Sequence, residues 1–366
     1  MNLFPALEAA YCRDSRPATE AQRLAELIAF GPIVFQVARI MLKWGILELL
    51  RNSPDGLTAD ETARRCSCTA YAAKVLLESS LTLGLVTLDR EAGRFHLAKT
   101  GWFLLTDPLT RVNLAFNHDV NYEGMFRLEE SLREGRPVGL EHFGPWRTIY
   151  EGLSQLPPEA QESWLAFDHF YSDQSFREAA DVVFGRPVRR LLDVGGNTGR
   201  WALHCVAHHP EVEVTVMDLP QQLDMMAAQT EGLPGADRIH GLPADVLAES
   251  TRFPAAPRFD AIWMSQFLDC FSPEQIVSIL SRAAEAMAPD TYLYILETFW
   301  DRQKYETAAF CLTQISLYFS ALANGNSKMY HSEDMADYAG RAGLEVVEIH
   351  DNLGHGHSLM VCRRKL

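Results

Sequence analysis

Short apolar runs alternate with longer helical stretches from residue 188 onward, and this alternation constrains the fold more than any other feature of the chain. Apolar runs of this length, separated by helical segments, are typical of parallel strands joined by crossover helices. The runs cover residues 190–195, 212–218, 259–265, 291–297, 345–350 and 358–362. The sequence therefore predicts an α/β domain built around a largely parallel sheet.

A glycine-rich turn, 193-DVGGNTG-199, ends the first of these runs. Such a turn between a strand and a helix lets the backbone approach a ligand, with helix N–H groups facing it. Asp218 ends the next run, where its carboxylate can accept hydrogen bonds from both ribose hydroxyls, and Asp245 is placed to bind an adenine amino group. The glycine spacing is not that of a G-x-G-x-x-G dinucleotide turn, and no excess of positive charge lies near it. The pattern predicts a nucleoside cofactor without phosphates, S-adenosylmethionine.

The charge balance excludes several classes of partner. Acidic residues outnumber basic residues by 48 to 33, which gives a formal net charge of −15. Because such a polyanion repels phosphate backbones and anionic lipid, we expect no nucleic-acid and no membrane partner. No apolar run reaches the roughly 18 residues of a membrane span, and the N-terminus has no basic segment before an apolar stretch, so we expect a cytoplasmic protein. Seven cysteines without a Cys-x-x-Cys pair predict reduced thiols, and we expect no metal site.

The first hundred residues predict a helical module that ends in a β-hairpin. Helical periodicity over residues 19–52 is followed by a capping-box pattern at Thr58 and Glu61. A second helix is expected at 71–83, followed by a hairpin made of 85–88 and 94–97. Helix, helix and hairpin form a winged-helix arrangement, which can bind DNA when its second helix is basic. The helix at 71–83 carries only one Lys and one Glu, so we expect the module to serve dimerisation.

These patterns predict three domains. Residues 1–105 form the winged-helix dimerisation domain, and residues 106–185 form an aromatic-rich helical linker and substrate-lid region. Residues 186–366 form the Rossmann-like domain that binds the cofactor and carries the catalytic residues.

The chain resembles, over nearly its whole length, the S-adenosylmethionine-dependent methyltransferases of the caffeate/hydroxyindole O-methyltransferase type. The motifs that carry this resemblance are 191-LLDVGGNTG-199, 216-VMDLP-220, 243-PADVL-247 and 260-DAIWMSQFLDCFSPEQ-275. The resemblance implies a class I methyltransferase domain, a homodimer formed through the N-terminal domain, and a small aromatic substrate. The segment 167-FDHFYSDQS-175 resembles the family's helix over the methionine end of the cofactor, with Ser172 matching a serine that touches it. The residues expected to contact the cofactor are Asp193, Gly195, Gly196, Gly199, Asp218, Leu219, Asp245, Val246, Ser265, Gln266 and Ser172.

The sequence departs from the family at its acid–base residues. The family's general-base histidine corresponds here to Asp269, and one of the two flanking glutamates is kept as Glu297. The other glutamate corresponds to Met329. The candidate acid–base and orienting residues are Asp269, Glu297, His331, Tyr330, His118 and His169. The candidate substrate contacts are Tyr171, which stands where the family usually has a ring-packing methionine, Phe170, His118, Phe310 and Met329.

The missing histidine bears on which atom is methylated. A phenol has a pKa of about 10, so O-methylation benefits from a base poised near neutrality, and an aspartate at about 4 suits this poorly unless burial raises its pKa. A phenolate, or a phenol held by a carboxylate, is nucleophilic at its ortho carbon. In this respect the chain looks most like a bacterial subgroup that C-methylates phenolic amino acids such as tyrosine and 3-hydroxykynurenine in secondary metabolism. The alternatives are ordinary O-methylation of a small phenol, a cofactor-assisted reaction without methyl transfer, and a non-catalytic scaffold that binds the cofactor.

Overall fold

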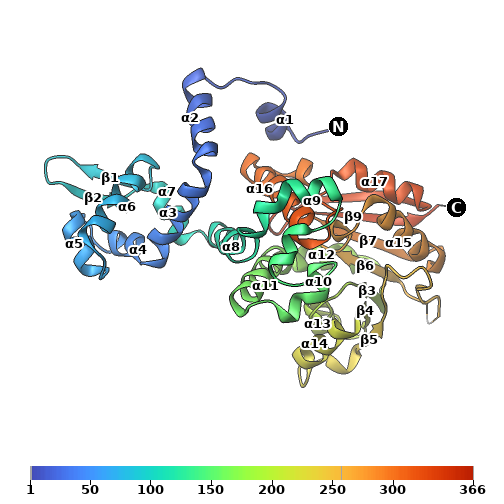
Figure 1. The fold of residues 1–366 in the computed structure, drawn as a ribbon. Coiled ribbons are helices and arrows are strands. Elements are labelled where there is room, and N and C mark those ends of the chain that lie inside the picture. Colours follow the sequence, from blue (N-terminus) through green and yellow to red (C-terminus); the bar gives the residue numbers. More distant parts are fainter. Residues whose placement is uncertain (1, 257, 366) are drawn as a thin grey trace. The chain divides into compact units, whose positions relative to one another are not determined.

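The computed structural model describes residues 2–256 and 258–365, which form two compact units (Figure 1). Asp14–Asp119 form the small unit, and Met1–Arg13 join Val120–Leu366 in the large unit. The chain therefore begins in the large unit, leaves it for the small unit and returns at residue 120. The predicted division at 105 and 185 stays a prediction. The N-terminal helix α1 (Pro5–Tyr11), however, belongs to the large unit and not to the module that follows it.

The small unit contains the predicted helices and hairpin. The capping box is confirmed, because Thr58 Oγ1 accepts the Glu61 N–H at 3.2 Å and Glu61 accepts the Thr58 N–H at 2.9 Å. Leu47, Leu77 and Val86 are buried in the core of this unit. Its elements are α2 (Ala18–Ala29), α3 (Gly31–Lys43), α4 (Ile46–Arg51), α5 (Ala59–Arg65), α6 (Ala70–Thr82), β1 (Val86–Asp89), β2 (Arg94–Leu97), α7 (Lys99–Thr106), α8 (Pro108–Phe116) and the first residues of the π turn η1 (Asn117–Asn121).

No single helix in the described part of the chain is long and apolar enough to cross a membrane. The pair α2 and α3 meets the length and composition criteria together, but the two helices bend by 75° at the break between them. The seven cysteines are all free thiols.

The large unit is built on a seven-stranded sheet with the order β5-β4-β3-β6-β7-β9-β8. The five strands β3 to β7 run parallel, and β9 pairs antiparallel with both β7 and β8. The α/β prediction is confirmed, and one strand that the apolar runs did not reveal, β5, forms an edge of the sheet. The strands are β3 (Arg190–Val194), β4 (Glu213–Asp218), β5 (Ile239–Pro243), β6 (Ala261–Ser265), β7 (Tyr292–Glu297), β8 (Leu344–Leu353) and β9 (His357–Arg364).

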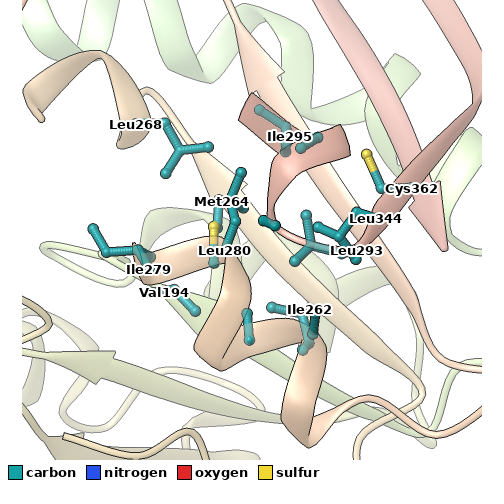
Figure 2. Close-up of a cluster of buried hydrophobic side chains, with 14 of the residues drawn as sticks. Val194, Ile262, Met264, Leu268, Ile279, Leu280, Leu293, Ile295, Leu344 and Cys362 are labelled. Carbon is teal, nitrogen blue, oxygen red and sulfur yellow. The ribbon is translucent and has the colours of Figure 1, made fainter. Parts of the chain in front are cut away.

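Helices cover both faces of this sheet. Since successive strand residues point to opposite faces, each face has its own hydrophobic core. Leu192, for example, lies in the core beneath α15 and α17, whereas Leu191 lies in the core beneath α12, α13 and α14. Figure 2 shows part of the first core, in which Leu268 packs near Met264 and Ile279. These helices are α12 (Phe176–Val183), α13 (Arg200–His208), α14 (Pro220–Thr230), α15 (Pro273–Ala286) and α17 (Ser332–Arg341).

The rest of the large unit is a set of helices and short turns. The helices are α9 (Leu128–Glu134), α10 (Ile149–Gly152), α11 (Pro158–Ser172) and α16 (Glu306–Tyr318). The turns are η2 (Gly124–Arg127), η3 (Val138–His142), η4 (Leu153–Gln155), η5 (Asp173–Ser175), η6 (Ala236–Arg238), η7 (Leu268–Cys270), η8 (Trp300–Arg302) and η9 (Phe319–Ala323).

Candidate active site

The parallel strands bring polar side chains together at one edge of the sheet. Asp218, Ser265 and Glu297 are the last residues of β4, β6 and β7, and Asp193 is the last residue but one of β3. The carboxyl ends of parallel strands meet at the same edge, and ligands of open α/β sheets bind there. The four residues therefore outline a candidate site.

The glycine-rich turn lies between β3 and α13 and leaves no room for side chains. Gly195 has a φ of +74°, and a Cβ on it would overlap the ring of Phe267. A Cβ on Gly196 would lie 2.5 Å from Asp193 Oδ2. Gly199, with a φ of +78°, is the N-cap of α13. Both glycines with positive φ adopt a conformation that side chains disfavour, so the turn keeps bare backbone at the edge of the sheet.

Asp218 is oriented by the backbone around it. Its Oδ2 accepts the Asn197 N–H at 2.9 Å, and its Oδ1 accepts the Leu219 N–H at 2.7 Å. Burial raises the pKa of Asp218, and these two backbone donors act in the opposite direction. The carboxylate is thus held beside the turn, as a group that binds a ribose would need to be.

Several buried polar atoms at this edge have no hydrogen-bond partner: Asp193 Oδ2, Asn197 Oδ1, Ser265 Oγ and Glu297 Oε2. Burial and the nearby Asp218 raise the pKa of Asp193 to about 8. Buried polar groups in folded proteins are normally hydrogen-bonded, so such a group of unpaired atoms indicates a polar ligand. Together with the bare glycine turn, these atoms fit the polar and cationic groups of S-adenosylmethionine.

The predicted adenine contact has weaker structural support. Asp245 is exposed, and its Oδ1 accepts the Leu247 N–H at 2.8 Å within its own turn. Val246 beside it is buried. The contact of Asp245 and Val246 with the cofactor stays a prediction.

Helix α11 adds an acid that the sequence patterns did not single out. Asp168 is close enough to Asn197 and Asp269 to interact with both, and burial with the nearby Asp173 raises its pKa to about 6. Ser172, four residues further along α11, donates to Asp173 at 3.1 Å. Asp168 and Ser172 lie on one face of α11 because they are four residues apart. This spacing is the sequence signal that could have identified Asp168.

Asp173 also forms an ion pair with Arg200 of α13, which ties α11 to the helix after the glycine turn. The neighbouring His169 has an unpartnered, buried Nε2, and burial followed by the charge of Arg200 lowers the pKa of His169. Ser172 and His169 therefore share the neighbourhood of Arg200 and Asp173, and their contacts with cofactor and substrate stay predictions.

Asp269 lies in η7, which follows β6 after two intervening residues, and is 5% exposed. Burial raises its pKa to about 7, and Asp168 adds to that effect. Glu297 is also buried, and its Oε1 accepts the N–H groups of Phe267 at 3.1 Å and Leu268 at 2.9 Å. Burial, with a further contribution from Asp269, raises the pKa of Glu297 well above its usual range. Two predicted acid–base residues are thus brought together, and the N-cap of the following helix α15 is Ser272.

Aromatic side chains surround this acid pair. Tyr150 of α10 donates to Cys270 Sγ at 3.0 Å, and Tyr330 donates to the Phe271 carbonyl at 2.6 Å. Tyr318 of α16 accepts the Trp164 indole N–H at 2.7 Å. All three phenols are close enough to Asp269 for its charge to contribute to their raised pKa values. Tyr150 and Tyr318 were missed by the sequence analysis, because aromatic residues at helical spacing do not differ in pattern from core residues.

His331 is not arranged as a proton-transfer group. Both ring nitrogens are engaged: Nδ1 accepts the Glu333 N–H at 3.1 Å, and Nε2 lies 3.1 Å from the Asn2 carbonyl. The side chain caps the N-terminus of α17 and is almost completely buried. These contacts correct the acid–base assignment and give His331 a structural role.

The remaining candidates are dispersed. His118 belongs to the small unit, where it pairs with Asp119 at 2.6 Å and stacks on Phe35, and its contact with a substrate stays a prediction. Phe310 is 56% exposed on α16, so the described structure does not support its placement in a closed pocket. Phe170 stacks on His355 at 4.7 Å.

Tyr171 is buried on α11, and its contact with a substrate stays a prediction. Two further predicted residues lie close to the sheet edge. Met329 is buried, and its sulfur accepts the Thr298 hydroxyl at 3.5 Å, one residue beyond Glu297. Gln266 adopts a φ of +45°, and its Oε1 lies 3.3 Å from Nε2 of the buried His357. Strained backbone at non-glycine residues is concentrated at functional sites, and the contact of Gln266 with the cofactor stays a prediction.

Comparison with protein families identifies both parts of the chain. Residues 22–95 match the Dimerisation2-like domain, and residues 174–345 match the O-methyltransferase domain. The chain belongs to the class I S-adenosylmethionine-dependent methyltransferases of the hydroxyindole/caffeate O-methyltransferase type. The fold class, the enzyme class and the cofactor predicted from the sequence are confirmed.

Curated relatives of this methyltransferase include both O- and C-methyltransferases. Acetylserotonin O-methyltransferase of Macaca mulatta is 22% identical over 293 residues, which cover 78% of this chain and 82% of the relative. The 3-hydroxy-5-methyl-1-naphthoate 3-O-methyltransferase of Streptomyces sahachiroi is 25% identical over 280 residues, 76% of this chain and 77% of the relative. The bacteriochlorophyllide d C-20 methyltransferase of Chlorobaculum tepidum is 21% identical over 279 residues, 75% of this chain and 78% of the relative.

Solved structures share the whole fold. The S-adenosylmethionine-dependent methyltransferase SibL in its apo form superposes with a TM-score of 0.70 at 25% identity, covering 93% of this chain and 98% of that one. Human N-acetylserotonin methyltransferase in complex with S-adenosylmethionine superposes with a TM-score of 0.64 at 19% identity, covering 97% of this chain and 100% of that one.

Proposed function

We propose that this methyltransferase transfers a methyl group to a small phenolic acceptor, at the ring carbon ortho to the hydroxyl. The observation that carries the proposal is a buried carboxyl group, Asp269, at the position that corresponds by resemblance to the family's histidine base. The acceptor class that fits best is a phenolic amino acid such as tyrosine or 3-hydroxykynurenine, modified in bacterial secondary metabolism.

The cofactor residues in this proposal are those at the carboxyl edge of the sheet. Asp218 holds the ribose, the bare backbone at Gly195 and Gly196 lies against the nucleoside, and Asp193 faces the positively charged end. When bound, S-adenosylmethionine supplies an electrophilic methyl group on a sulfonium. The protein then has to hold the acceptor about 3–3.5 Å from that methyl group and keep it nucleophilic.

Asp269 is the proposed base. A base is most effective when its pKa lies near the working pH, because it is then ionised and still has a strong driving force for accepting a proton. Burial gives Asp269 a pKa of this kind, and burial also raises the pKa of Glu297 well above its usual range. Because the two acids interact, their carboxyls respond to pH as a pair.

Carbon methylation follows from holding the hydroxyl at this carboxylate. Asp269 accepts the phenolic proton, or a strong hydrogen bond from it, and the electron density of the ring rises at the ortho carbon. That carbon forms the new C–C bond as the S–C bond breaks, and the bonding pair of the S–C bond stays on sulfur. The ring hydrogen then leaves as a proton, which restores aromaticity. Asp269 can accept this second proton once it has returned the first one to the phenol oxygen, or when it has only held the hydroxyl by a hydrogen bond.

O-methylation of a small phenol is the second candidate. It is favoured by the raised pKa of Asp269, which removes the mismatch expected for an ordinary aspartate, and by similarity to the naphthoate 3-O-methyltransferase. C-methylation is favoured by the change of base type and by similarity to the C-20 methyltransferase. Both candidates use the same cofactor and the same base.

Product analysis separates them. The protein is incubated with methyl-¹³C S-adenosylmethionine and either L-tyrosine, 3-hydroxykynurenine or a simple phenol, and the product is examined by NMR. A label in the aryl C–CH₃ region, together with loss of turnover in Asp269→Asn, is the expected result. A label in the O–CH₃ region would replace the proposal with the second candidate. Turnover without any methylated product would indicate a cofactor-assisted reaction, and cofactor binding in calorimetry without turnover of any acceptor would indicate a scaffold.

A homodimer formed through the small unit is also proposed. The family match to a Dimerisation2-like domain supports it, as do the exposed apolar side chains on α2 and α3. These side chains are Leu24, Leu27, Ile28 and Ile33. A cytoplasmic location remains a prediction from the sequence.

A further inference from the structure

A short chain of hydrogen bonds ends on the carboxylate of Asp269. The Tyr150 hydroxyl, on α10, donates to Cys270 Sγ at 3.0 Å. The Cys270 thiol in turn donates to Asp269 Oδ1 at 3.5 Å. Among the described residues, Cys270 is the only side chain that donates to this carboxylate. Oδ1 is therefore engaged by the thiol, the backbone N–H of Asp269 also interacts with the carboxylate, and Oδ2 has no side-chain donor among the described residues.

The backbone of the same turn is held by other contacts that do not involve the thiol. Glu297 accepts the N–H of Leu268, and Asn324 Nδ2 donates to the Cys270 carbonyl at 2.5 Å. Leu268 itself is fully buried in the core beneath α15 (Figure 2). Because these contacts fix the turn, removal of the Cys270 thiol should change the partner of the carboxylate and leave the turn in place.

We propose that Cys270 and Tyr150 are positioning residues for Asp269: Tyr150 orients the thiol, and the thiol fixes Oδ1 so that Oδ2 faces the acceptor. The inference rests on the proposed role of Asp269 as the base. Neither residue has to touch the acceptor, because both act through the carboxylate.

The nature of the donor matters as well as its place. A thiol is a weak hydrogen-bond donor, and a donor to a carboxylate favours the ionised form in proportion to its strength. Burial keeps Cys270 in its protonated, donating form by raising the pKa of its thiol well above the usual range. The weak donor orients Asp269 while leaving its pKa high enough for a base. A hydroxyl at the same place should lower that pKa, and a methyl group should raise it.

Other titratable groups face Asp269. Each variant proposed below keeps all of them except the residue that it replaces. They are the carboxyls of Asp168 on α11 and Glu297 on β7, the phenols of Tyr150 on α10, Tyr318 on α16 and Tyr330 before α17, and the Cys270 thiol. The phenols and the thiol titrate well above neutral pH, so the two carboxyls are the groups whose protonation accompanies that of Asp269. The shift between variants, rather than one absolute pKa, is the informative quantity.

The test compares the full-length variants Cys270→Ala, Cys270→Ser and Tyr150→Phe with the wild type. Single-turnover methylation rates are measured from pH 5.5 to 9 with the acceptor identified by NMR. In the pH–rate profile, the acid limb is the range in which the rate falls as pH drops. We expect Cys270→Ala to shift the midpoint of this limb up by about one pH unit, with a roughly tenfold loss of rate at pH 6 and near-normal rates at pH 9. In Cys270→Ser the midpoint should equal that of the wild type or lie below it, and in Tyr150→Phe it should rise by less than in Cys270→Ala. Cys362→Ala, a buried cysteine in β9, is the matched control and should leave the limb unchanged.

A second readout does not depend on an acceptor. The infrared band of the protonated Asp269 carboxyl is identified as the one that is lost in Asp269→Asn. Its intensity is followed against pH, and the midpoint of this titration should lie at a higher pH in Cys270→Ala than in the wild type. If neither the acid limb nor this midpoint moves in Cys270→Ala, while Asp269→Asn is inactive, the positioning proposal is wrong and the base assignment stands. If Asp269→Asn keeps full activity, the proposed function is wrong. Should Cys270→Ala fail to fold, unchanged midpoints in both Cys270→Ser and Tyr150→Phe would overturn the proposal, and shifted ones would support it.

Discussion

Glu297 accepts the backbone N–H of Leu268 at 2.9 Å, and this bond ties the end of β7 to the turn that carries Asp269. The neighbouring Phe267 N–H donates to the same oxygen at 3.1 Å. The proposed base is therefore positioned by a strand of the central sheet and not by a mobile loop. Sites supported by regular elements hold their geometry more closely than sites built on loops, which suits a reaction that depends on orientation.

Replacement of Asp269 by Asn should remove the base while keeping the shape of the side chain. We expect kcat/KM for methyl transfer to fall by about 10²- to 10⁴-fold, the usual contribution of a general base. The wild-type rate should fall as pH drops through about 7, because Asp269 must be ionised to accept a proton. The variant should lack this limb. Calorimetry should give an unchanged affinity for S-adenosylmethionine, and a large loss of cofactor affinity would contradict the assignment to the acceptor side.

Two substitutions of Glu297 should separate its hydrogen bonds from its charge. Glu297→Ala leaves the N–H groups of Phe267 and Leu268 without their acceptor, and each buried unsatisfied group costs about 1–3 kcal/mol. Denaturant unfolding should show this loss. Glu297→Gln keeps an acceptor oxygen and should be close to the wild type in stability. Equal stability of the two variants would mean that the bonds are replaced by water.

Gly195 and Gly93 form a matched pair for the glycine-rich turn. Both have positive φ, +74° and +64°, so alanine at either should cost about 1–2 kcal/mol in backbone strain. A Cβ at Gly93, in the hairpin of the small unit, meets nothing within 4 Å, whereas a Cβ at Gly195 overlaps the ring of Phe267. Gly195→Ala should therefore also abolish detectable cofactor binding, measured by calorimetry. Normal binding by Gly195→Ala would rule out the turn as the cofactor site.

Asp193 should make the cofactor-free protein less stable as pH rises. Its pKa is raised to about 8, so the folded state keeps a proton that the unfolded chain releases near pH 4. The free energy of unfolding should thus fall from about pH 4 to pH 8. Asp193→Asn lacks this dependence, and its melting temperature should exceed that of the wild type by several degrees at pH 8, with little difference at pH 4. A difference that is constant with pH would contradict the raised pKa.

The exposed apolar side chains of α2 predict an interface between two copies of the chain. Ile28 is 71% exposed, and a charge there should weaken a contact that buries it. Ile28→Asp should lower the mass measured by light scattering from that of a dimer to that of a monomer. Leu233→Asp changes a 45% exposed side chain in the loop after α14 of the large unit, and it should leave the mass unchanged.

The local features of the fold were readable from the sequence, and the long-range ones were not. The capping box at Thr58, the strands and the glycine turn depend on neighbouring residues, and all are present. β5 was missed because its sequence, IHGLP, contains few apolar residues and forms a sheet edge. The sequence singled out Asp269 as a departure from the family, and that correspondence stays a prediction. The raised pKa of Asp269 could not be predicted, since it depends on burial by segments distant in the chain.

The same reason explains the residues that were overlooked or misassigned. Asp168, Tyr150 and Tyr318 come from three different helices, and only folding brings them near Asp269. His331 was a reasonable acid–base candidate from its place in the sequence. Its bond to the Asn2 carbonyl joins residues 329 positions apart, which no local pattern reveals.

That bond belongs to a wider contact of the first residues with the large unit, in which the Phe4 N–H donates to the Asp301 carbonyl at 3.1 Å. The small unit is consequently an insertion in the sequence of the large unit, because the segments before and after it both belong to the large unit. During synthesis the first residues must wait for their partners in the large unit, because Phe4 and Asp301 are 301 − 4 = 297 positions apart and Asn2 and His331 are 329 positions apart. Completion of the large unit is thus a late, non-local closing step, and fusion of a bulky tag directly before Asn2 should slow that step without affecting the small unit.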